Sequence, residues 1–291
     1  MFVKNALKTV FLVCSSLIGA GFASGREIIE FFPPGKGLIT SLLSVALISL
    51  SIYLIPDFSD VICINPLYKL TVCLFSFCVI SVMISASGEF LPMGRFIMSF
   101  LVFSTLIFGI RGVENVSLIL CPAMILFILI FGLERIWGIK FYELEFGNIT
   151  QSFLYAGYNI IILPTLLKKA TYSKGITASL VFIIMGSLIL IVYFASSLFP
   201  YDTMPFVSAV GSNAITVAII LMALYTTAVC SGFCICDVFH ISPRICFITV
   251  FLSYILSYSG FGNLISIGYR TFGITGVFII IYGMFQKKKA L

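Results

Sequence analysis

Charged residues are scarce in this sequence. Only 10% of its 291 residues are Asp, Glu, Lys or Arg, 60% are hydrophobic, and the mean hydropathy is +1.18. A soluble globular domain carries about 25% charged residues, and no stretch of this chain is polar enough to form one. The composition excludes a soluble protein and predicts an all-α integral membrane protein in contact with the lipid bilayer.

Histidine is nearly absent, because His240 is the only one. A Ser/His/Asp or Cys/His catalytic set would have to use that single residue, and no Walker A sequence is present to bind ATP. Cys230, Cys234 and Cys236 precede His240 but lack the paired Cys-x-x-Cys pattern of a zinc site. We therefore expect neither an enzyme nor a transition-metal site.

Long apolar runs occupy most of the chain. Most span about 18 to 25 residues, enough to cross roughly 30 Å of hydrocarbon as a helix, and there is room for about ten crossings in one transmembrane domain, 1–291. The expected spans are 8–32, 38–55, 70–87, 95–110, 116–133, 149–167, 176–199, 213–236, 245–258 and 263–285.

Lys and Arg residues collect at the ends of these spans. The net charge of the chain, +6, therefore reflects topology and does not indicate a nucleic-acid partner. Ten spans place eleven Lys and Arg residues on one side and five on the other, with Arg270 left out because it falls inside the last span. By the positive-inside rule, both termini are expected in the cytoplasm and the protein in the cell membrane.

Three glycines interrupt the first span. Gly19, Gly21 and Gly25 lie within seven positions, and each costs roughly 1 kcal/mol of helix propensity relative to Ala. Unwound backbone within a membrane must face protein or water, which makes the break a candidate binding site. The alternative is close helix packing, because the same glycines fit a small-xxx-small pattern.

A second irregularity falls at 155–159 and is followed by Pro164. It lies about half the chain beyond the first break, and each break opens a set of five expected spans. An odd number of spans inserts the second half upside down, which predicts a 5+5 inverted repeat with broken spans 1 and 6. The repeats would be 1–133 and 149–285.

Four segments carry a family resemblance: IGAGFASGREIIEFF at 18–32, ISVMISASGEFLPMG at 80–94, YAGYNIIILP at 155–164 and LYTTAV at 224–229. With these segments, the chain resembles the YkvI-type bacterial membrane proteins of the amino acid/polyamine/organocation superfamily, which share the fold of the leucine transporter LeuT. The resemblance covers nearly the whole chain. It implies a LeuT-like architecture in which spans 1 and 6 cradle the substrate.

The resemblance also implies site residues. Backbone N–H groups at the span 1 break would hold a substrate carboxylate, span 6 would face it, and oxygen ligands from spans 1 and 8 would bind one sodium ion. The implied substrate-binding residues are Gly19, Ala20, Gly21, Tyr155, Gly157, Tyr158 and Asn159. The implied sodium-binding residues are Ser15, Ile18, Ala223, Thr226 and Thr227.

The threonine ligands have a structural alternative, and so does a further hypothesis about a gate. The hydroxyls of Thr226 and Thr227 would bond to carbonyls one turn earlier if they are not ion ligands. Glu27 or Glu30 would pair with Arg270 as an outer gate, because spans 1 and 10 are neighbours in the resembled fold. Alternatively, these charges lie among lipid headgroups and are solvated.

The residues together with this resemblance imply a secondary transporter of a small solute, with an amino acid favoured, that works by sodium or proton symport with alternating access. The alternative is a ligand-sensing receptor subunit of the same fold, similar to spore germinant receptors, which binds a ligand without transporting it. No cofactor other than a sodium ion is expected, and the oligomeric state is not predicted.

Overall fold

The computed structural model describes residues 2–136, 146–168, 173–259, 271–279, 281–283 and 285, with side chains from residue 6 onward. Every regular element in these ranges is a helix. Five helices are long and apolar enough to cross a membrane. They are α4 (Leu38–Leu54, continued by η1, Ile55–Asp57), α6 (Pro66–Phe90), α8 (Gly109–Ile136), α11 (Lys174–Ser196) and α13 (Ala214–Val238).

Shorter apolar helices lie between and after these five. They are α7 (Gly94–Leu106), α14 (Pro243–Leu256, followed by η2, Ser257–Ser259) and a helix that includes residues 271–279. The order of helices follows the expected spans, although the last one, 263–285, is described only in part. The all-helical membrane fold is thus confirmed, while the count of ten crossings stays a prediction.

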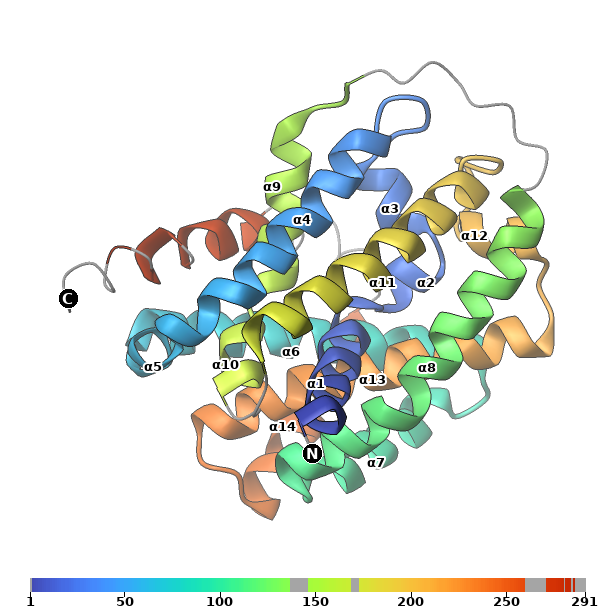
Figure 1. Cartoon of the computed structure of the whole chain (residues 1–291). Coiled ribbons are helices and arrows are strands. Elements are labelled where there is room, and N and C mark those ends of the chain that lie inside the picture. The colour runs from blue at the N-terminus through green and yellow to red at the C-terminus, as the bar shows by residue number, and fades with distance from the viewer. Residues whose placement is uncertain are drawn as a thin grey trace.

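The first span is broken twice (Figure 1). Helix α1 (Phe2–Leu17) ends before Gly19, which is extended at φ −82° and ψ 179°. The four-residue α2 (Ala20–Ala23) follows, and a left-handed Gly25 at φ 77° precedes α3 (Arg26–Phe31). The glycines thus break the helix where the sequence predicted.

The break in the sixth span lies later than predicted. Helix α9 (Ile149–Ile160) runs without interruption through the expected irregularity at 155–159, and the helix breaks at 161–162 before α10 (Leu163–Lys168). Pro164 explains the position, since proline has no N–H to donate to the carbonyl one turn earlier. One glycine, Gly157, is tolerated within a packed helix.

Short helices replace two expected loops. Helix α5 (Ser59–Ile64) lies between α4 and α6, and α12 (Pro205–Val210) lies between α11 and α13. Prolines start helices well because their missing N–H is unpaired there in any case, and Pro66 and Pro205 each occupy the first turn of their helix.

The helices form one bundle (Figure 1). Helix α4 packs along α11 and against α9, α13 packs along α6, and α1 contacts α8, α11 and α13. Two ion pairs, Lys168 with Asp60 at 3.2 Å and Lys174 with Asp57, bring the connections after α4 and after α10 to the same end. The expected topology also places these connections on one side.

Glycines bring α9 and the helix at 271–279 into close contact. A Cβ on Gly157 would collide with the carbonyl oxygen of Gly273 and lie 2.9 Å from Val277, and a Cβ on Gly276 would collide with the carbonyl of Gly157. Close backbone approach through small residues is typical of packing between membrane helices.

Gly157→Ala should therefore lower stability by about 1 to 3 kcal/mol, because the added methyl group overpacks the contact. A thermal unfolding experiment in detergent would show a lower Tm. Gly186→Ala in α11 is the matched control, since a Cβ there meets no atom within 4 Å. An equal Tm for the two variants would contradict the tight contact.

Candidate binding site at the broken helices

The break in span 1 leaves backbone groups outside the helical pattern. The extended Gly19 interrupts the hydrogen bonds of α1, and the first bond of the next turn is donated by Ala23 to the Gly19 carbonyl at 2.9 Å. The N–H groups of Ala20 and Gly21 come before that bond, as at any helix start. Gly19 and Ala20 are buried in the protein, and Gly21 is partly buried.

The expected ion ligands divide into two groups. The Thr227 hydroxyl of α13 lies 3.5 Å from the Ile18 carbonyl oxygen, directly across the break. By contrast, the Thr226 hydroxyl donates to the Ala223 carbonyl of its own helix at 3.2 Å. The structure thus brings Ile18 and Thr227 together, and it places Thr226 and Ala223 as a back-bonded pair one turn apart.

Ser15 connects three helices near this break. Its hydroxyl lies 2.9 Å from the Leu12 carbonyl, 2.7 Å from the Ser117 hydroxyl of α8 and 3.8 Å from the Cys230 sulfur of α13. These contacts hold the end of α1 against both neighbouring helices.

The break in span 6 is held by side chains that sequence analysis did not identify. The buried Tyr68 hydroxyl of α6 donates to the Ile161 carbonyl at 3.1 Å and lies 2.9 Å from the Thr165 hydroxyl. The Cys234 thiol of α13 lies 3.8 Å from the Ile162 carbonyl. The broken backbone is thereby satisfied inside the bundle, as a membrane requires.

The four expected substrate residues of span 6 do not share one face, because α9 is a regular helix there. Tyr155 is buried with its ring 5.3 Å from those of Phe31 and Phe32, at the end of α3. Asn159, one turn later, donates to the Tyr155 carbonyl at 2.9 Å.

Gly157 packs against the helix at 271–279, and the Tyr158 ring lies 5.3 Å from that of Phe75 in α6. Residues two apart in a helix point in nearly opposite directions. Gly157 therefore points away from Tyr155, Tyr158 and Asn159, and Tyr155 contacts the end of span 1 through Phe31 and Phe32.

The second kink of span 1, at Gly25, is in contact with α12. The Phe206 N–H donates to the Ser24 carbonyl at 2.9 Å, and Phe206 Cβ lies 2.8 Å from where a Gly25 Cβ would be. The Arg26 guanidinium lies 3.5 Å from the Asp202 carbonyl. The short helix α12, which had no sequence signal beyond Pro205, is thus attached directly to the broken span.

The proposed gate charges differ in their surroundings. The Glu27 side chain is only 5% exposed, and its Oε1 has no hydrogen-bond partner among the described residues, whereas Glu30 is exposed. The Glu27 side chain is therefore buried within the protein, which disagrees with the alternative that it is solvated among lipid headgroups. Arg270, the expected partner, lies outside the described residues.

No protein-family model and no curated protein matches this sequence. Among solved structures, the chain is similar to Mhp1, a nucleobase-cation-symport-1 family transporter, in a closed conformation with bromovinylhydantoin bound. The TM-score is 0.52 at 13% sequence identity, and the match covers 87% of this chain and 70% of that one. This likeness shows that the two chains share a fold.

Proposed function

We propose that this chain is a secondary transporter that moves a small solute, an amino acid in the first instance, by symport with a cation. The observation that carries the proposal is the broken span 1 facing α13, with the Ile18 carbonyl 3.5 Å from the Thr227 hydroxyl. Discontinuous helices near the middle of a membrane bind substrates and ions in many transporters. The fold shared with a cation symporter supports this interpretation.

The pattern of helix contacts supports the 5+5 inverted repeat. In such a repeat, span 2 corresponds to span 7 and span 3 corresponds to span 8. These pairs are α4 with α11 and α6 with α13, and the two helices of each pair are in contact. The same correspondence relates the α4 contact with α9 to the contact of α11 with α1, and both occur. A repeat of this kind allows one group of helices to rock against the other around a fixed site.

The candidate cation site uses oxygen ligands alone. The Ile18 carbonyl and the Thr227 hydroxyl approach each other from two helices, and carbonyl and hydroxyl oxygens suit a hard cation such as sodium. A cation bound there would hold α1 against α13. Ion binding would thereby stabilise one arrangement of the broken span and couple the ion gradient to the solute.

An amino acid is proposed as the substrate because of the backbone N–H groups at the break in span 1. The N–H groups of Ala20 and Gly21 precede the first hydrogen bond of α2 and would donate hydrogen bonds to a substrate carboxylate. The structure of Mhp1 contains bound bromovinylhydantoin. A labelled mixture of amino acids and hydantoins would therefore be the first substrates to test.

The test is uptake into proteoliposomes with and without an inward sodium gradient and, separately, with a proton gradient. Gradient-driven accumulation of one labelled solute is the expected result. Binding of the solute with a higher Tm, but without accumulation under either gradient, would overturn the transporter and favour the receptor alternative.

Thr227→Val should reduce sodium-driven uptake at least about tenfold, because the variant keeps its shape but loses the hydroxyl that faces the Ile18 carbonyl. Thr71→Val is the matched control, since the Thr71 hydroxyl only donates to Leu67 within α6. Dependence of uptake on sodium concentration is the measurement. Unchanged sodium dependence in Thr227→Val would remove the cation from this position.

A further inference from the structure

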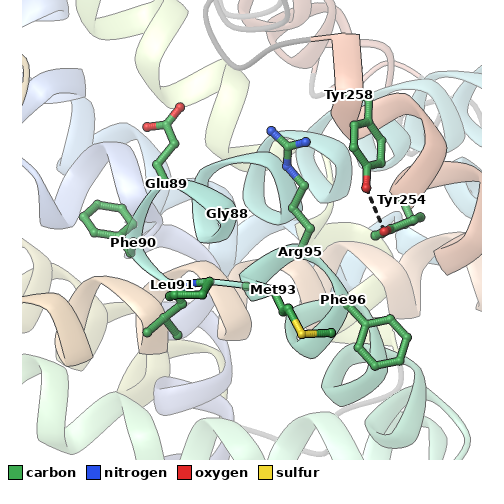
Figure 2. A pocket seen from close by; sticks show the side chains of 11 residues that line it. Gly88, Glu89, Phe90, Leu91, Met93, Arg95, Phe96, Tyr254 and Tyr258 are labelled. Carbon is green, nitrogen blue, oxygen red and sulfur yellow. Dashed lines mark hydrogen bonds between the residues drawn. The ribbon is translucent and has the colours of Figure 1, made fainter.

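A cavity of about 750 Å³ lies at the turn between α6 and α7, away from the broken helices. Its polar groups come from Glu89, Arg95, Tyr254 and Tyr258 (Figure 2). The Arg95 guanidinium lies 4.6 Å from the centroid of the Tyr258 ring, and the Tyr254 and Tyr258 hydroxyls are 2.8 Å apart. A cation and two hydroxyl groups therefore converge on one end of α7 and α14.

Arg95 has no anion to balance it among the described residues. Its Nε is buried without a hydrogen-bond partner, and Figure 2 shows the Glu89 and Arg95 side chains on either side of Gly88 and not paired. Arg95 also lies in the first turn of α7, which has no acidic residue and no side-chain cap. A cation beside the positive end of a helix dipole is unfavourable unless an anion binds there.

An apolar groove of about 350 Å³ continues from this cavity between α7 and α14, and Phe96 and Tyr254 line both. Phe100 and Phe103 form one wall of the groove, and Phe247 and Phe251 form the other. On each helix the lining residues follow the three-to-four-residue spacing of a single face.

This groove lies on the outside of the bundle. Phe96 and Phe100 are 58% and 61% exposed, and Phe247 and Phe251 are 55% and 50% exposed. The rings of Phe103 and Phe247, 5.9 Å apart, meet at the end away from Arg95. The eight residues from Arg95 to Phe103 correspond to about 12 Å along a helix, close to half of the roughly 30 Å hydrocarbon core.

We propose that this cavity and groove bind one anionic phospholipid. Its phosphate lies between the Arg95 guanidinium, the start of α7 and the two tyrosine hydroxyls, and an acyl chain lies in the phenylalanine groove. A free phosphate leaves the groove unfilled, and a choline headgroup places a second cation beside Arg95. The bound lipid fixes α14 against α7, and the site does not depend on the proposed transport function.

The test is native mass spectrometry of the delipidated full chain titrated with dioleoyl phosphatidylglycerol or dioleoyl phosphatidylcholine. One phosphatidylglycerol should bind about tenfold more tightly than phosphatidylcholine, because both lipids offer a phosphate to Arg95 but the choline group of phosphatidylcholine places a second cation beside it. Arg95→Gln should remove this difference and Arg95→Lys should keep part of it. Arg111→Gln, at an exposed position of α8, should leave it unchanged.

Phe251→Ala should weaken both lipids together, since it removes a groove wall without touching the charge. Because Phe251 is half exposed, this variant also keeps the proposal testable if Arg95→Gln fails to fold. Equal binding of the two lipids by the unmodified chain would overturn the proposal. Unchanged phosphatidylglycerol binding in Arg95→Gln would also overturn the proposal. Displacement of phosphatidylglycerol by inorganic phosphate at equal concentration would overturn it too, because it would indicate a site for free anions.

Discussion

Gly25→Ala should abolish uptake and destabilise the protein. Gly25 has φ 77°, and a Cβ there would collide with the Ser196 hydroxyl and lie 2.8 Å from Phe206 Cβ and 2.9 Å from Phe206 N. The left-handed backbone costs an alanine about 1 to 2 kcal/mol, and overpacking adds about 1 to 3 kcal/mol. Relief of the collision would also break the bond from Phe206 to Ser24 that attaches α12 to span 1.

Gly35→Ala separates the two costs. Gly35 has φ 82°, but a Cβ there meets no atom within 4 Å, so only the backbone term applies. Its Tm should fall less than that of Gly25→Ala, and its uptake should be retained. A second variant, Gly25→Ala combined with Ser196→Gly, should recover part of the Tm because it removes one colliding group. Equal effects of the two alanine substitutions would show that the contact with α12 is not tight.

The first break was predictable because its cause is local. Three glycines within seven positions weaken a helix whatever surrounds it, and the structure breaks at Gly19 and Gly25. The second break was misplaced because the predicted irregularity at 155–159 gave weight to one glycine and two tyrosines. Pro164 favours a break just before it, and the residues at 155–159 continue α9 because they pack against α3, α6 and the helix at 271–279.

Contacts between distant segments could not be predicted in the same way. Tyr68 and Ile161 are 93 residues apart, and Cys234 and Ile162 are 72 apart. An apolar span gives no signal that one tyrosine or cysteine in it faces an unwound backbone elsewhere. Ile18 and Thr227, 209 residues apart, were paired only through a family resemblance. A Cβ on Gly19 would lie 3.5 Å from the Thr227 hydroxyl, which is an ordinary contact, so the glycine itself does not account for their proximity.

Glu27→Gln should reduce gradient-driven uptake at least about tenfold while leaving the Tm unchanged or higher. The Glu27 side chain is 5% exposed in α3, and its Oε1 has no hydrogen-bond partner among the described residues. An unpaired carboxyl group in a membrane interior is costly and is retained where it serves function. The amide keeps the shape and removes the carboxyl group that, in the proposed transport cycle, would exchange a proton or meet a cation.

Glu30→Gln is the matched control, because Glu30 lies one turn later on the same short helix and is exposed. It should change uptake less than about twofold, as surface substitutions usually have small effects. Solute exchange between equal concentrations distinguishes the role of Glu27 further. If Glu27 carries the coupling proton, Glu27→Gln should lose proton-driven accumulation but keep exchange, since exchange requires no net proton movement. Loss of exchange with intact folding would instead assign Glu27 to solute or sodium binding, and full uptake in Glu27→Gln would leave this carboxyl group without a transport role.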